Sequence, residues 1–221
     1  MKKISTLLIV SIFTLFSSFA FADSSDFDGI YIGVSGGVAG SELDGKYTDN
    51  DSAVTKGSGG MVTSIASWEI GYDFAIGDMF TIGVGYSVLP GEAKLSKSDS
   101  AASDADITVK ADNFATAYAQ INMLVSESTA LMVKAGSVDA DLTYAGASSI
   151  GTKPGAMSGD VLAFGVKSAL SNNLYLKSEV GMIEFEKIKL LNITSNSGAN
   201  TGDVEADPSV AYGLITLGYQ F

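Results

Sequence analysis

Hydrophobic and polar residues alternate along most of this chain, and the alternation recurs in eight blocks. In the block spanning 62–74, for example, Trp68 and Ile70 share one face while Glu69 and Gly71 lie on the other. A period of two residues is the signature of a β-strand whose two faces meet different surroundings. The blocks therefore predict an all-β chain. They cover residues 30–38, 62–74, 80–88, 107–125, 131–144, 162–170, 175–182 and 212–221.

Short and long connections between these blocks alternate strictly. Three connections are tight turns, and they fall at residues 75–78, 126–129 and 171–173. Four are long and polar, and they fall at about 41–60, 90–106, 146–159 and 191–208. Short turns at one end and long loops at the other are typical of outer-membrane β-barrels, whose long loops are extracellular.

The two faces of the blocks differ in a way that indicates lipid outside the barrel. One face is apolar, whereas the other carries Lys, Glu, Gln, Asn and many of the 25 glycines. A soluble barrel such as a lipocalin would expose this second face to water, and it would be an unusual surface. The pattern favours an eight-stranded antiparallel up-and-down transmembrane β-barrel over residues 23–221. Ten strands are the alternative, if the second or third long loop hides another hairpin.

The first 22 residues have the pattern of a secretory signal peptide. Lys2 and Lys3 precede an apolar run over 4–19, and Ala-Phe-Ala at 20–22 supplies the small residues of a cleavage site. An uncleaved membrane anchor is the competing interpretation, but the run is short for a span of about 20 residues. We expect cleavage of residues 1–22 and a mature chain that begins at Asp23.

The last strand predicts how the barrel is assembled. Leu217, Tyr219 and Phe221 share its apolar face, and the chain ends on a free phenylalanine. This ending resembles the C-terminal assembly signal of bacterial outer-membrane barrels, which has aromatic residues at the last and third-last positions. The resemblance implies that the barrel-assembly machinery is a partner and that the bacterial outer membrane is the location.

Further strand segments extend this resemblance to the whole mature chain. They are Gly-Ile-Tyr-Ile-Gly at 29–33, Glu-Ile-Gly-Tyr-Asp-Phe at 69–74 and Gly-Val-Gly-Tyr at 83–86. With them, the chain resembles the small outer-membrane β-barrel family, the OmpA/OmpX-type eight-stranded barrels. Such strand chemistry identifies an architecture and leaves the biological role open.

Composition excludes several kinds of chemistry. The chain has no Cys, no His and a net charge of −12, and all 13 of its cations are lysines. Disulfides and thiolate chemistry are excluded, and so is a nucleophile activated by histidine. Nucleic acid is not an expected partner, because its binding rewards clustered Lys and Arg. We therefore expect a non-enzymatic protein without a cofactor or a bound metal.

Charged residues also occur on the glycine-rich face, which would line the lumen. The lumen of an eight-stranded barrel is only wide enough for side chains, and charges there must be paired. We predict an interior network that plugs the lumen; a gated pore, in which this network opens, is the alternative. The residues predicted to form the network are Glu69, Lys134, Lys167, Lys177 and Glu179.

The predicted loops contain acidic residues but no recognisable ligand motif. Asp49-Asn-Asp51 lacks the glycine and the twelfth-position glutamate of an EF-hand, so solvated loop charge is preferred to a calcium site. The sequence favours a structural, surface-exposed barrel that supports envelope integrity or contacts surface ligands through its acidic loops. A porin-like passive channel for small solutes is the second interpretation. Outer-membrane lipid is the expected surrounding, and we expect a monomer.

Overall fold

The computed structural model of the chain describes residues 27–49, 51–97, 108–145, 149–170, 173–194 and 201–221. The predicted signal peptide and its cleavage site lie outside these residues. In the part that is described, no helix is long and apolar enough to cross a membrane. The described chain is built almost wholly from strands. These are β1 (Gly29–Asp49), β2 (Val54–Ile76), β3 (Phe80–Lys97), β4 (Thr108–Ser126), β5 (Thr129–Ala145), β6 (Ser149–Thr152), β7 (Ala156–Ala169), β8 (Leu174–Phe185), β9 (Ile188–Thr194) and β10 (Thr201–Gln220).

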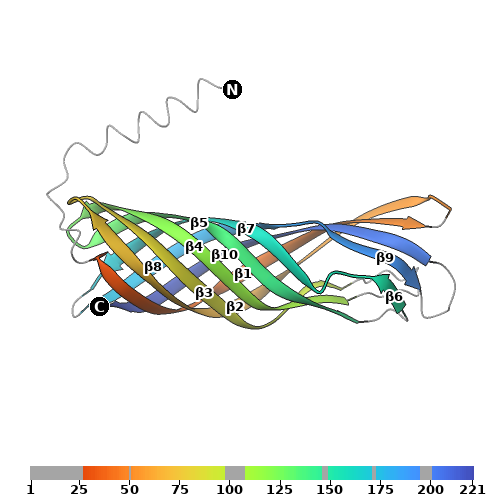
Figure 1. Cartoon of the computed structure of the whole chain (residues 1–221), viewed down its shortest axis with the longest axis horizontal. Coiled ribbons are helices and arrows are strands. Elements are labelled where there is room, and N and C mark those ends of the chain that lie inside the picture. The colour runs from red at the N-terminus through yellow and green to blue at the C-terminus, as the bar shows by residue number, and fades with distance from the viewer. Residues whose placement is uncertain (1–26, 50, 98–107, 146–148, 171–172, 195–200) are drawn as a thin grey trace, which may run out of the picture.

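Eight of these strands close into an antiparallel barrel (Figure 1). Their order is β1-β2-β3-β4-β5-β7-β8-β10, and β1 pairs with β10 to close the ring. The prediction of eight strands is therefore confirmed. The short strands β6 and β9 stand outside the ring, since β9 pairs with the outer part of β10 and β6 pairs with β9. They extend the far end of the barrel, away from the C-terminus.

The strands are staggered around the barrel, and the stagger fixes its width. Following the paired residues from Glu42 through Ser209 and once around the ring leads back to Ile32, ten residues lower on β1. A barrel of eight strands with such a stagger has strands tilted by about 40° and an interior that side chains fill. A lumen of this width can be largely filled by side chains.

The outward face of the barrel is apolar, as the alternation predicts. Val34, Val180 and Ile215 are more than half exposed, with relative exposures of 65%, 64% and 61%. Aromatic side chains gather at the end where the short turns lie, and Tyr219 and Phe221 have ring centroids 4.8 Å apart. Polar and charged residues are buried inside instead. This inverted arrangement is that of a barrel surrounded by lipid.

All four predicted long loops contain strand that the sequence did not indicate: β6 and the start of β7 lie in 146–159, and parts of β9 and β10 lie in 191–208. In the predicted loop 41–60, β1 and β2 remain paired as far as Thr48 and Val54. In the predicted loop 90–106, β3 runs to Lys97. Residues 54–64 of β2 are all exposed, and the apolar alternation fades there because backbone pairing needs no apolar face. Figure 1 shows the β1–β2 hairpin, in orange, continuing past the body of the barrel.

The barrel wall is interrupted between β2 and β3. Their pairing ends at Trp68 and Val88, although β2 stays paired with β1 to Val54 and β3 stays paired with β4 to Lys97. Trp68 lies eight residues above Ile76, the last residue of β2. That distance is roughly 20 Å along the barrel axis, whereas the apolar band of such barrels is about 25 Å tall. The break therefore begins within the outer part of the lipid-facing band.

Closure of the barrel can be tested with an engineered disulfide, because the chain has no cysteine of its own. Ser35 and Thr216 are paired residues on β1 and β10, and their side-chain oxygens lie 2.7 Å apart. Paired residues of antiparallel strands have Cα separations of about 4.5–5.5 Å, which a disulfide can span. We expect the double variant Ser35→Cys/Thr216→Cys to cross-link under mild oxidation and to migrate faster on a denaturing gel without reductant.

The control for this experiment is Ser35→Cys/Ser87→Cys. Ser87 is on β3, where it pairs with Glu69 and Thr116 rather than with any residue of β1. This control should not cross-link within one chain. Equal cross-linking of both variants, or of neither, would contradict the registry of β1 and β10.

Candidate functional site

The first of three interior ion pairs lies near the end of the barrel that carries the C-terminus. The Lys167 ammonium is 2.8 Å from a carboxylate oxygen of Asp73, and both side chains are buried. Lys167 also donates to the Gln220 side-chain oxygen at 2.7 Å, and the Gln120 amide donates to Asp73 at 2.8 Å. Asp73 is thereby held by an ammonium on one oxygen and an amide on the other.

The second ion pair joins Lys177 on β8 to Glu69 on β2. The Lys177 ammonium donates to both carboxylate oxygens of Glu69, at 2.7 and 2.6 Å. The hydroxyls of Tyr175 and Tyr118 donate to the same carboxylate, at 3.0 and 3.2 Å. Such charge-assisted bonds are stronger than neutral ones. Glu69 therefore ties together β2, β4 and β8 across the lumen.

The third ion pair joins Lys134 on β5 to Glu179 on β8. The Tyr212 hydroxyl donates to Glu179 at 2.7 Å, so β10 joins the same group. The Lys177 ammonium lies 3.6 Å from the other Glu179 oxygen and links the second pair to the third. The Lys134 ammonium is also 4.8 Å from the ring centroid of Tyr118, which adds a cation–π contact.

The structure links four of the five predicted network residues by direct ion-pair contacts, and the fifth, Lys167, adjoins them through Tyr175, whose ring centroid lies 4.6 Å from the Lys167 ammonium. Glu69, Lys177, Glu179 and Lys134 form a continuous chain of contacts. Lys167 pairs with Asp73, which the sequence reasoning missed. The charge balance of the predicted network could have revealed Asp73, because the network has three lysines but only two glutamates. Asp73 shares the inward face of its strand with Glu69, four residues earlier in the chain, and supplies the missing negative charge.

Interior tyrosines lie over glycines of neighbouring strands. An added Cβ at Gly85 would be 2.5 Å from the Tyr118 ring, and one at Gly181 would be 2.5 Å from the Tyr212 ring. Glycine is required at both positions, because any larger residue would move the tyrosine that donates to a glutamate. The glycines on the polar face thus make room for the aromatic members of the network.

An apolar group closes the lumen below the network. Phe27 is fully buried and packs with Leu124, Ala130 and Ala169. Its ring centroid is 5.7 Å from the Lys167 ammonium. Apolar packing at this end removes water from around the lowest ion pair.

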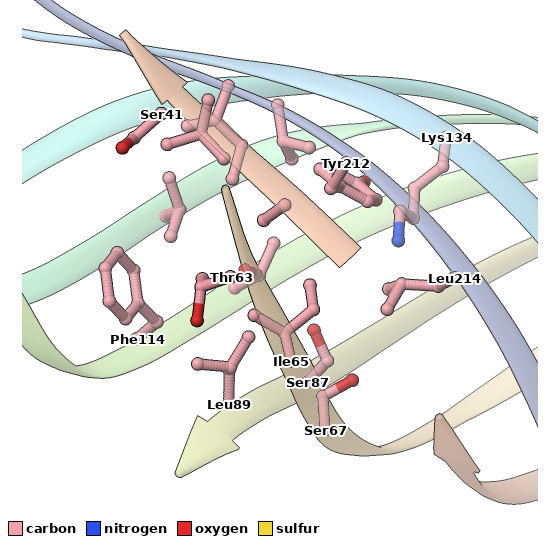
Figure 2. Close-up of a pocket in the computed structure, with 16 residues that line it drawn as sticks. Ser41, Thr63, Ile65, Ser67, Ser87, Leu89, Phe114, Lys134, Tyr212 and Leu214 are labelled. Carbon is pink, nitrogen blue, oxygen red and sulfur yellow. The ribbon is translucent and has the colours of Figure 1, made fainter. Parts of the chain in front are cut away.

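A cavity of about 100 Å³ lies on the other side of the network. Lys134 and Tyr212 line it next to the ion pairs, and Figure 2 shows the Lys134 nitrogen turned into it. Most of the remaining lining is apolar, with hydroxyl groups from serine and threonine residues between. The apolar lining residues include Ala39, Ile65, Leu89, Phe114, Val138 and Leu214.

A second apolar cluster lies beyond the cavity, on one side of the barrel. It is formed by residues of β4, β5, β7, β8 and β9, such as Leu142, Phe185 and Leu190. Val138 belongs to this cluster and also lines the cavity. The axial path from the outside to the cavity is therefore packed with side chains on this side of the barrel.

The cavity borders the break in the barrel wall. Ile65 and Ser67 of β2 and Ser87 and Leu89 of β3 line it, and these residues flank the level at which β2 and β3 stop pairing. Figure 2 shows Ile65, Ser67, Ser87 and Leu89 on the two ribbons at the lower side of the cavity. The arrangement places a largely apolar cavity beside the break between β2 and β3.

No arrangement for metal binding is found in the described ranges, in which no cluster of three acidic side chains could hold an ion. The predicted assembly-signal residues Leu217, Tyr219 and Phe221 lie on the lipid-facing side of β10, with relative exposures of 50%, 37% and 64%. Their recognition by the assembly machinery stays a prediction.

No model of a known protein family matches the sequence, and no curated protein is similar to it in sequence. Solved structures do share its architecture. The outer membrane protein OprG from Pseudomonas aeruginosa superposes with a TM-score of 0.55 at 17% identity, over 88% of this chain and 97% of OprG. The chain has the fold of a small bacterial outer-membrane β-barrel. This confirms, at the level of fold, the resemblance to OmpA/OmpX-type barrels.

Other outer-membrane barrels superpose less closely. Neisserial surface protein A has a TM-score of 0.44 at 13% identity, over 87% of this chain and 97% of that protein. Ail of Yersinia pestis has a TM-score of 0.43 at 9% identity, over 85% of this chain and 99% of Ail.

Removing the charge of Lys134 should destabilise the barrel. In Lys134→Met the buried Glu179 carboxylate loses its nearest ammonium and keeps only that of Lys177, 3.6 Å away, which Glu69 also holds. Breaking a buried ion pair costs about 3–5 kcal/mol in other proteins. We expect a lower urea midpoint for unfolding in detergent, and the heat-dependent shift in gel mobility measures the folded fraction. Lys56→Met, on the exposed part of β2, is the matched control and should unfold like the wild type.

The double variant Lys134→Met/Glu179→Gln removes both charges and should recover much of the lost stability, because no unpaired ion remains. Unchanged unfolding of Lys134→Met would show that this ion pair does not stabilise the barrel.

Proposed function

We propose that this protein is a non-enzymatic outer-membrane barrel that admits small apolar molecules sideways through its wall. The observation that carries the proposal is the apolar cavity beside the point where β2 and β3 part. Such molecules would reach the cavity from outside, between the two strand edges, and would pass into the surrounding lipid by the same break.

The interior network supports a barrel that is closed to ions and water-soluble solutes along its axis. Three buried ion pairs and the tyrosines bonded to them occupy the lumen on the side of the short turns. Opening a water-filled path would mean separating several charge-assisted hydrogen bonds in a narrow space. A plug is therefore preferred to the gated pore, and a porin-like channel is the weaker interpretation.

The size and chemistry of the cavity indicate the class of molecule. A cavity of about 100 Å³ is of the same order as an engineered apolar cavity of about 150 Å³ that binds benzene. Its open side can accommodate part of a somewhat larger molecule. The proposed class is thus single-ring aromatic or short aliphatic compounds.

A surface role through the extracellular segments is the second candidate, as the sequence favoured. The observation in its support is the β1–β2 hairpin, which stands beyond the barrel and exposes Val54, Met61 and Val62. These side chains and the nearby acidic residues would contact a surface ligand. The proposal also includes three expectations from the sequence. The outward face contacts outer-membrane lipid, the barrel-assembly machinery recognises the last strand, and the protein is a monomer.

Planar lipid bilayers test whether the axis is closed. We expect the refolded wild-type protein to add no discrete current steps, because the ion pairs fill the lumen. A porin of known conductance in the same bilayer is the positive control. Reproducible steps from the wild type would support the porin-like interpretation and overturn the plugged lumen.

Filling the cavity should abolish uptake of small apolar molecules. Ala39 lines the cavity, whereas the neighbouring Val38 faces lipid with a relative exposure of 55%. We expect cells that make the Ala39→Phe variant to accumulate radiolabelled toluene no faster than cells without the protein. The matched control Val38→Phe adds a ring outside and should behave like the wild type.

Both variants should still show the heat-dependent shift in gel mobility, so that a loss of uptake is not a loss of folding. Equal uptake by the wild type, Ala39→Phe and cells without the protein would contradict the proposed function.

A further inference from the structure

Among the described residues, Lys134 is the one charged side chain on the cavity lining, and its charge is already balanced. Glu179, which does not line the cavity, forms the ion pair with it. Tyr212 lies beside Lys134 on the same side of the cavity and donates its hydroxyl hydrogen to Glu179 (Figure 2). An ammonium has three N–H donors, so one accepted by Glu179 leaves others for a molecule in the cavity.

The whole network is neutral as well. In the described residues, the buried charged side chains are three lysines and three acids, Lys134, Lys167, Lys177, Glu69, Asp73 and Glu179. A carboxylate that entered the cavity would bring an uncompensated charge into a space with little water, and such a charge is costly. A neutral molecule leaves the balance intact and can accept a hydrogen bond from Lys134.

We infer that the cavity selects neutral apolar molecules that carry one hydrogen-bond acceptor, such as an aromatic ketone, over carboxylates of the same size. Glu179 sets this preference because it neutralises Lys134. The inference rests on the proposed function, in which the cavity receives small apolar molecules. Lys134 contacts the ligand, and Glu179 is a specificity-determining residue that acts through Lys134.

The test compares 4-fluoroacetophenone with 4-fluorobenzoate, which share a ring and differ in charge. The mature wild-type chain in lipid nanodiscs is titrated with each compound at neutral pH and followed by fluorine NMR. Empty nanodiscs measure the partition into lipid, which is subtracted. We expect the ketone to bind at least about tenfold more tightly than the benzoate, because the benzoate carboxylate would be buried without a free cation as its partner.

Glu179→Gln should abolish this preference. Glutamine can still accept the Tyr212 hydrogen bond through its side-chain oxygen, but it leaves the Lys134 charge uncompensated. The affinity for 4-fluorobenzoate should rise by about tenfold, because the carboxylate now supplies the missing negative charge. Lys134→Met/Glu179→Gln, which has neither charge, should bind the ketone more weakly than the wild type and should not gain affinity for the benzoate.

The outcomes separate the two proposals. Equal affinity of the wild type for both compounds, or an unchanged preference in Glu179→Gln, would overturn the inference and leave the proposed function standing. Binding of neither compound by the wild type would overturn the proposed function itself. If Glu179→Gln does not fold, the inference is still tested by the wild type and by the double variant Lys134→Met/Glu179→Gln. A preference of either protein for the benzoate over the ketone would contradict the inference.

Discussion

The narrow lumen of the eight-stranded barrel is the constraint on which the rest of this structure depends. Eight strands with a stagger of ten residues enclose a space that side chains fill, so an interior ion cannot keep a shell of water. Charged residues inside must therefore find protein partners. Lys134, Lys177 and Lys167 each do so with an acid from another strand. Tyrosine hydroxyls also donate to Glu69 and Glu179, and the Gln120 amide donates to Asp73.

The same constraint divides the lumen into two parts with different chemistry. Near the short turns, the ion pairs and the Phe27 group occupy the interior. Beyond Lys134 the interior side chains become apolar, and the packing leaves the cavity unfilled. Movement along the axis would require several ion pairs to separate together, whereas movement through the wall leaves each of them intact. In the proposed function, the polar network would therefore close the axis and leave the break in the wall as the route for a ligand.

The outer end of the barrel is asymmetric, and this asymmetry produces the break in the wall. The strands from β4 to β9 share an apolar cluster that includes Leu142, Phe185 and Leu190. The outer part of β2 has no comparable packing, since its residues from 54 to 64 are exposed. Its edge beyond Trp68 has lost β3 as a partner. An unpaired edge invites pairing with other chains, and the small and polar residues of this segment, including Lys56, make such pairing less favourable.

The sequence by itself determined the number of strands in the ring, the side of each strand that faces lipid, and most of the charges that lie inside. It could do so because a period of two residues assigns each side chain to a face without reference to the other strands. Tertiary structure decided the partners, because the stagger brings residues of distant strands to one level; Lys167 meets Asp73 for this reason. It also decided the cavity and the break between β2 and β3. The outer part of β2 is paired without an apolar alternation in the sequence, so the order of residues does not show where the pairing with β3 ends. Nor does it show which interior side chains leave a cavity between them.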